Sequence, residues 1–240
     1  MLYTYNLSHF CTLTPSKTQS FLSLFSFRAN NLLDDRMSSN DSDPFFMWMS
    51  FNVPHSPVLA VDDAHLQYFS HIQNADRREY LAALWRMDYK VGELISKLKE
   101  TGEYDNTIFV YTSDNGPTGE GSAWPLRGAK GGSAEGGVRV PSFVSGPNIK
   151  PGVLDRMNIM HIMDWTATLV DFAGLDPTSA NPDFDGMSFK ELILENSRSL
   201  IIDSPKNIFL IVVRIHLLTA LQIPQHPGQN FIITSLRSPL

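Results

Sequence analysis

Residues 106–116, NTIFVYTSDNG, join a short apolar run to a polar turn, and this combination decides the fold class. The run at 106–112 has the length and the β-branched and aromatic content of a buried strand. In open α/β sheets, ligands bind beyond the carboxyl ends of the strands. Asp114 and Asn115 follow such an end, and a carboxylate beside an amide oxygen is donor chemistry that hard cations prefer. Asp-Asn-Gly is also ordinary turn chemistry, so both interpretations stay open at this point.

The surrounding pattern predicts a layered α/β domain. Residues 45–51 (FFMWMSF) and 138–144 are predicted to be two further buried strands. Apolar residues spaced by four and three predict a long helix over 76–101, with Asp76 as its N-cap. A short helix is predicted over 163–173. Strands that alternate with helices in this way predict parallel pairing within one sheet.

Composition divides the 240 residues into three segments. Residues 1–43 are rich in serine, threonine and asparagine, and we expect this segment to be divergent and poorly ordered. Residues 44–198 carry the regular patterning of a globular domain. Residues 199–240 mix apolar runs with prolines and show no clear period, so we expect a divergent tail.

Charge and cysteine content exclude several classes of protein. The net charge of −6 at pH 7 argues against a nucleic-acid-binding protein, which usually presents a basic surface. The single cysteine, Cys11, excludes an internal disulfide and a cysteine-rich zinc site. The most apolar run, 208–223, contains Arg214 and His216, so we expect no membrane span. The first basic residue is Lys17, and the N-terminus therefore shows no clear signal peptide.

A histidine follows the predicted strand at 45–51. Pro54 and Pro57 bracket His55 and restrict the backbone around it. A histidine that is held rigidly at the end of a strand can act as a general acid near neutral pH. A lone histidine is more often structural, so both roles stay open.

Glycines concentrate between the second and third predicted strands. Residues 116–137 hold eight of the 15 glycines, and such a stretch lets the backbone approach a ligand closely. Arg127, Lys130 and Arg139 make this part of an acidic protein locally basic, which suits an anionic ligand. An ordinary solvated loop is the alternative.

Taken in order, the motifs resemble those of the sulfatase family, with the arylsulfatase B-type branch as the nearest. The resemblance covers residues 44–198. It rests on PHSP (54–57), SHIQ (70–73) with RR.Y (77–80), SDNG (113–116), WPLRGAK (124–130), EGGVRVP (135–141), HIMDW (161–165) with the helix that follows, and DFDG (183–186). It implies part of an alkaline-phosphatase-like α/β fold, with a mixed sheet flanked by helices. It also implies calcium-assisted hydrolysis of sulfate esters, with glycosaminoglycans and other sulfated glycans as candidate substrates, and a lysosomal or secreted location.

The resemblance assigns roles to four residues by position. His55 matches a histidine that contacts the sulfate ester and can protonate the leaving oxygen. Lys130 matches a lysine that pairs with the sulfate and offsets its charge. Asp114 and Asn115 match two ligands of the active-site calcium, an ion that takes about six to eight oxygen ligands. The calcium site is therefore expected to be incomplete in this chain.

The family nucleophile has no counterpart in this sequence. It is a formylglycine made from the cysteine of a Cys-x-Pro-x-Arg motif, and the sequence contains no such motif. Cys11 is followed by TLTPSK and is not assigned as a nucleophile. Asp34 and Asp35 follow no predicted buried strand and are not assigned to the calcium site. We therefore expect the chain to be a fragment of a larger catalytic domain and to be inactive alone.

Two alternative functions stay open from the sequence. One is a non-catalytic sulfatase-like protein that binds sulfated sugars through the loop of Lys130. The other is a related metal-dependent phosphoester hydrolase. The sequence predicts no oligomeric state.

Overall fold

The computed structural model describes residues 21–55, 63–153, 158–180, 183, 185–195 and 230–236. Cys11 and the apolar run at 208–223 lie outside these described residues. Within the described ranges, no helix has both the length and the apolar character needed to cross a membrane.

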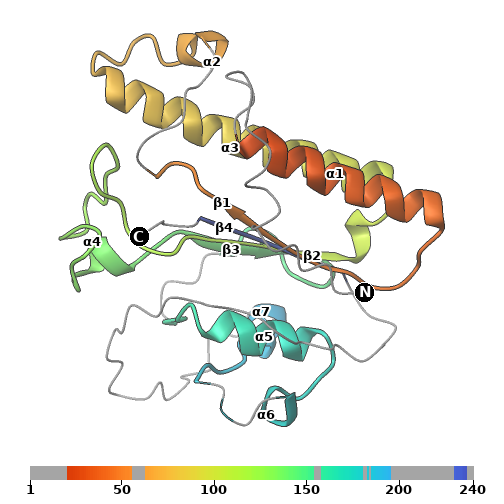
Figure 1. The fold of residues 1–240 in the computed structure, drawn as a ribbon. Helices are drawn as coiled ribbons and strands as arrows, with labels where there is room; N and C mark the ends of the chain where they lie inside the picture. The colour runs from red at the N-terminus through yellow and green to blue at the C-terminus, as the bar shows by residue number, and fades with distance from the viewer. Residues whose placement is uncertain are drawn as a thin grey trace.

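A four-stranded mixed sheet lies between two layers of helices (Figure 1). The strands are β1 (Phe46–Phe51), β2 (Thr107–Thr112), β3 (Ser142–Ser145) and β4 (Asn230–Leu236). On one face lie α1 (Phe21–Ser39) and α3 (Ala75–Glu100), with α2 (Asp63–Gln67) beside α3; on the other lie α5 (Asp164–Phe172), α6 (Pro177–Ala180) and α7 (Lys190–Glu195). The short helix α4 (Glu135–Val138) and a 3-10 turn (Tyr104–Asn106) lie in the connections. The predicted α/β class with a mixed sheet is confirmed.

The strand order is β1-β4-β2-β3, and β4 pairs in parallel with both of its neighbours. In register, Ile233 faces Trp48 of β1 on one side and Val110 of β2 on the other. The expected parallel direction of β1 and β2 therefore holds, although the two strands pair through β4 and not with each other. The strand between them comes from the segment 199–240, for which the sequence predicted no regular structure.

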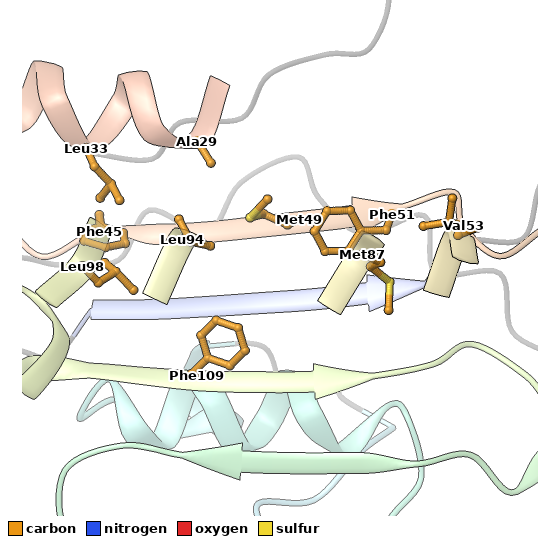
Figure 2. Packing of buried hydrophobic residues seen from close by; sticks show 11 residues of the cluster. Ala29, Leu33, Phe45, Met49, Phe51, Val53, Met87, Leu94, Leu98 and Phe109 are labelled. Carbon is orange, nitrogen blue, oxygen red and sulfur yellow. The ribbon is translucent and has the colours of Figure 1, made fainter. Parts of the chain in front are cut away.

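Two apolar clusters fix the sheet between its helices. Residues of β2 alternate between the clusters: Phe109 faces α3, whereas Ile108 and Val110 face α5. Because helices cover both faces, β2 reads as a continuous apolar run and not as an alternating one. Figure 2 shows the cluster on the α1 and α3 side, with Ala29, Leu33, Phe45, Met49, Phe51, Val53, Met87, Leu94, Leu98 and Phe109.

The long helix predicted over 76–101 is confirmed as α3. Its N-cap is Asn74 and not the predicted Asp76, because the Asn74 side chain accepts a 2.7 Å hydrogen bond from the backbone N–H of Arg77. Asp76 lies in the first turn instead, where its negative charge interacts favourably with the positive end of the helix dipole. Gly102 ends the helix with φ +74°, a conformation that glycine adopts without strain. The helix predicted over 163–173 is confirmed as α5.

Residues 21–39 form α1, where the sequence predicted a poorly ordered segment. Ala29 and Leu33 lie one turn apart and reach the core, and Leu33 is only 1% exposed. Asp34 on the same helix forms an ion pair with Lys97 of α3. The serine- and asparagine-rich composition concealed a narrow apolar stripe, and this stripe is enough to pack the helix against α3.

The third strand differs from its prediction in position and in burial. The predicted strand at 138–144 begins only at Ser142, because residues 135–138 form α4. β3 pairs antiparallel with β2 at the edge of the sheet, and Phe143 is 53% exposed there. It is therefore an edge strand and not a buried one.

Replacing Ile233 with proline tests the central position of β4. Proline has no N–H to donate to the sheet, and an unpaired carbonyl inside the ladder costs about 1–3 kcal/mol. We expect Ile233→Pro to lower the free energy of unfolding by at least that amount, measured by urea denaturation with far-UV circular dichroism. Ile233→Ala keeps the N–H and serves as the control. Equal stability of the two variants would show that the backbone of β4 is not paired.

Candidate active site

The candidate site lies beyond the carboxyl ends of β1 and β2. Both strands run parallel to β4, so these two ends meet at the same edge of the sheet. His55 follows the end of β1 by four residues, and the Ser113–Gly116 turn follows β2 directly. The loop over residues 116–137 then leads from β2 to α4.

The two residues expected to handle sulfate lie in contact. The Lys130 Nζ atom is 3.2 Å from the His55 Nε2 atom, although 75 residues separate the two along the chain. A lysine ammonium can only donate, so the contact requires a lone pair on Nε2 and the ring proton on Nδ1. Both side chains are half-buried, so a solute can still reach them.

His55 is held close to the end of β1. Its backbone N–H donates to the carbonyl of Asn52 at 3.1 Å, and the buried side chain of Val53 anchors the segment in the core. Pro54 belongs to this turn, whereas Pro57 lies outside the described residues. The histidine is therefore presented from a short turn and not from a long loop.

The turn after β2 places a carboxylate at the surface. Ser113 is buried and Asp114 is exposed. The carboxylate of Asp114 accepts a 2.9 Å hydrogen bond from the backbone N–H of Asn115. The side-chain nitrogen of Asn115 donates to the carbonyl of Gly116 at 2.9 Å, which leaves the side-chain oxygen as the group able to coordinate a cation. Asp114 and Asn115 can therefore form a turn and at the same time offer side-chain oxygens to a cation.

These oxygen donors fit a hard cation in chemistry but not in number. Among the described residues, no group of three or more histidine, cysteine, aspartate or glutamate side chains is placed to hold a metal ion. Asp114 and Asn115 supply two of the about six to eight oxygens that calcium takes. The described residues therefore form at most part of a calcium site.

Close backbone packing shapes the glycine-rich loop. Gly116 donates to the carbonyl of Gly137 at 2.8 Å, and Gly136 donates to the carbonyl of Arg127 at 2.7 Å. A Cβ atom on Gly136 would lie 2.8 Å from the carbonyl oxygen of Arg127, and one on Gly116 would collide with the carbonyl of Gly136. The glycines were expected to let the backbone approach a ligand; in the structure they let one part of the loop approach another.

The three cations of this region have different surroundings. Arg139 forms an ion pair with Glu135 one helical turn earlier, at 3.3 Å, and this pair offsets its charge. Arg127 is exposed to solvent. The ammonium of Lys130 contacts the ring of His55.

Sequence reasoning missed the residues of α3 that support the loop. Arg77 donates to the backbone carbonyl of Glu120, and the hydroxyl of Tyr80 lies against Gly121. The sequence signals are their place on the first turns of a helix and within the RR.Y stretch of the family resemblance, which assigned them no role. Their role depends on tertiary contacts, which spacing alone does not give.

Two other groups of acidic residues have structural roles. The buried carboxylate of Asp164 accepts backbone hydrogen bonds from His161 at 2.6 Å and from Met187 at 2.9 Å, so it ties α5 to the segment before α7. Asp34 is paired with Lys97, on the helical layer over the sheet. Its location agrees with leaving the Asp34-Asp35 pair out of the site.

Comparison with known proteins gives a consistent result. The sequence model of the Sulfatase family matches residues 15–175, a range that begins inside the segment expected to be divergent. Arylsulfatase J of Mus musculus is 36% identical over 167 residues, which are 69% of this chain and 28% of that relative. An arylsulfatase of Hemicentrotus pulcherrimus is 34% identical and matches 77% of this chain and 32% of its own length.

Among solved structures, Ps i-CgsB is similar with a TM-score of 0.68 and 31% identity. The similarity covers 75% of this chain and 40% of that protein. The chain thus spans about a third of the length of the curated relatives that it matches.

Replacing Gly136 with alanine tests the packing of the loop. The added methyl group would overlap the backbone of Arg127 and Gly128, and overpacking of this kind costs about 1–3 kcal/mol. We expect Gly136→Ala to destabilise the protein by that amount in urea denaturation. Gly92→Ala is the matched control, because a Cβ atom at this exposed position in α3 meets nothing within 4 Å. It is expected to stabilise the helix by about 0.5–1 kcal/mol. A Gly136→Ala variant as stable as the unaltered protein would refute the packing argument.

Proposed function

This chain belongs to the sulfatase family, and from that premise we propose that Lys130 and His55 bind the sulfate group of a sulfate ester, whose hydrolysis also needs a nucleophile motif that this sequence does not contain. The observation that carries the proposal is the 3.2 Å contact between Lys130 Nζ and His55 Nε2. It joins a cation and a titratable ring at the carboxyl edge of the sheet, where α/β proteins bind ligands.

The two side chains have complementary chemistry for a sulfate ester. The ester is an anion, and its oxygens are stronger acceptors for the Lys130 ammonium than a neutral imidazole nitrogen. Binding of the ester therefore releases the Nε2 atom of His55 from Lys130. The released Nε2 atom can take up a proton from water. When the bond between sulfur and the ester oxygen breaks, that oxygen needs a proton, and the protonated His55 can donate the one on Nε2.

We also propose that Asp114 and Asn115 each contribute one oxygen to a calcium ion. A bound calcium would polarise the sulfate group. The described residues hold no group of three or more acidic, histidine or cysteine side chains that could complete this site, and two ligands alone bind calcium weakly.

Sulfated glycans are the substrate class that we propose. Trp124 lies on the same loop as Lys130 and is 87% exposed, and an exposed aromatic ring offers a flat apolar face to a sugar ring. Arg127, exposed beside it, adds a positive charge for a second anionic group. Ps i-CgsB has also been solved in complex with k-i-k-neocarrahexaose. For this chain we propose a lysosomal or secreted location, as the family resemblance implies.

One observation favours a second candidate function. The sequence contains no Cys-x-Pro-x-Arg motif, and Cys11 lies outside the described residues. The second candidate is therefore a protein that binds a sulfated sugar without turning it over, which requires that Lys130 recognises sulfate in the absence of that nucleophile. Binding and turnover are therefore measured separately, and phosphate is compared with sulfate to test the phosphoester alternative.

Replacing Lys130 with alanine tests sulfate recognition. Removing a charged hydrogen-bond donor from a bound anion costs about 1.5–3 kcal/mol, which is a loss of about tenfold or more in affinity. We expect Lys130→Ala to weaken the binding of inorganic sulfate by that factor in isothermal titration calorimetry. The control is Lys150→Ala, which removes an exposed lysine elsewhere and should leave the affinity unchanged.

The same titrations separate the alternatives. Tighter binding of inorganic phosphate than of sulfate would favour the phosphoester alternative, and a sulfated disaccharide that binds no better than sulfate would argue against glycans. An aryl sulfate supplied with calcium should stay unhydrolysed by this chain. If Lys130→Ala and Lys150→Ala behave alike, Lys130 is not the sulfate ligand.

Replacing Asp114 with asparagine tests the proposed cation ligand. A ligand that binds only the folded state raises its stability by about 1.4 kcal/mol at ten times the dissociation constant. We expect millimolar calcium to raise the melting temperature of the wild-type chain, and Asp114→Asn to remove most of this rise. Asp105→Asn, which changes another exposed carboxylate, is the control. An unchanged calcium response in Asp114→Asn would exclude Asp114 as a ligand.

A further inference from the structure

The first turns of α3 contact a tight turn in the loop of Lys130. Residues 117–121 form this turn, and its Gly121 N–H donates to the carbonyl of Thr118 at 3.1 Å. The guanidinium of Arg77 donates to the carbonyl of Glu120 in the same turn. Arg77 also lies over the ring of Tyr80, 5.4 Å from its centroid. One helix thus holds the turn through a charged donor and an aromatic side chain.

The turn is packed so closely, within itself and against Tyr80, that position 121 has no room for a side chain. A Cβ atom on Gly121 would collide with Pro117 and would lie 3.1 Å from the hydroxyl of Tyr80. Burial raises the pKa of the Tyr80 phenol above its ordinary value, although the charge of Arg77 acts in the opposite direction. The phenol is therefore neutral at physiological pH, and Tyr80 presents a ring face to Arg77.

The held turn is bonded directly to the backbone of Lys130. The N–H of Lys130 donates to the carbonyl of Pro117 at 3.0 Å, at the start of the turn. A lysine side chain is long and flexible, so its ammonium stays near a fixed partner only if its backbone is fixed. The path from α3 to the site therefore runs from Arg77 through Glu120 and Pro117 to Lys130, and from there to His55.

We propose that Arg77 is a positioning residue for the sulfate site: it fixes the 117–121 turn and so places the Lys130 ammonium beside His55. The inference rests on the proposed role of Lys130 in sulfate binding. Arg77 does not contact the substrate in this proposal. Arg77 raises the population of molecules in which the Lys130 ammonium lies beside His55 and can bind sulfate.

The neighbouring arginine provides a matched control. Arg78 donates through Nε at 3.0 Å and through a terminal nitrogen at 2.7 Å, both to the carbonyl of Ile72. This carbonyl precedes α3 and does not belong to the loop of Lys130. Arg77 and Arg78 thus have the same charge, the same helix turn and the same kind of acceptor, and differ in which segment they hold.

The experiment compares Arg77→Met, Arg77→Lys and Arg78→Met in the full chain, with inorganic sulfate as the probe in calorimetry. Loss of one hydrogen bond corresponds to a change in affinity of about twofold to tenfold. We expect Arg77→Met to weaken sulfate binding by that factor, Arg77→Lys to restore part of it, and Arg78→Met to leave it unchanged. Hydrogen exchange should show a faster Lys130 amide in Arg77→Met, with α3 amides and far-UV circular dichroism unchanged.

Lys130→Ala distinguishes failure of this inference from failure of the proposed function. If Lys130→Ala loses sulfate affinity while Arg77→Met keeps it, the positioning role is refuted and the sulfate site stands. If Lys130→Ala keeps its affinity, the proposed function fails first. Equal losses in Arg77→Met and Arg78→Met would show a general effect on α3, which also overturns the positioning role.

Discussion

Parallel pairing of β4 with both β1 and β2 is the constraint on which the candidate site depends. Parallel strands send their carboxyl ends to one edge of a sheet, and here β1 and β2 are separated by the width of a single strand. His55 follows the carboxyl end of β1, and Asp114 follows the carboxyl end of β2. The strand that sets their spacing comes from the far end of the chain. The pairing of strands that are distant in sequence therefore brings His55 and Asp114 to the same edge of the sheet, and the local loops only refine their positions.

Local sequence signals predicted most of the elements that carry the site. The apolar runs of β1 and β2, the apolar stripe of α3 and the short helix α5 were all predicted from apolar patterning. β1 is less buried than its sequence predicted, because it is an edge strand of the described sheet and only Met49 and Phe51 in it are buried. α1 was missed because only a narrow stripe around Ala29 and Leu33 reaches the core. β4 was missed because its pairing is with two strands that lie far away in the sequence. The N-cap of α3 was displaced by two residues, since asparagine and aspartate are both good caps and only the backbone decides between them.

The residues of the site divide in the same way. SDNG is recognisable as a polar turn after a strand, and the structure places it there. The meeting of His55 and Lys130 does not follow from spacing, because 75 residues lie between them; only the family resemblance anticipated a common role. Arg77 and Tyr80 belong to a stretch that the family resemblance includes, but the resemblance assigned no role to them. Tertiary hydrogen bonds to backbone carbonyls are invisible to periodicity, and such bonds hold the loop.

The glycine-rich loop has a consequence for how such a protein can diversify. Its shape is encoded by main-chain hydrogen bonds and by the missing side chains of Gly116, Gly136 and Gly137, and not by the side chains that face solvent. Positions such as Trp124 and Arg127 can therefore be exchanged without moving the backbone of Lys130. If the proposed roles hold, recognition of the anionic group by Lys130 and selection among the molecules that carry it are separable in this loop. Substitutions at the exposed positions of the loop can then change the selection while recognition of the anionic group is kept.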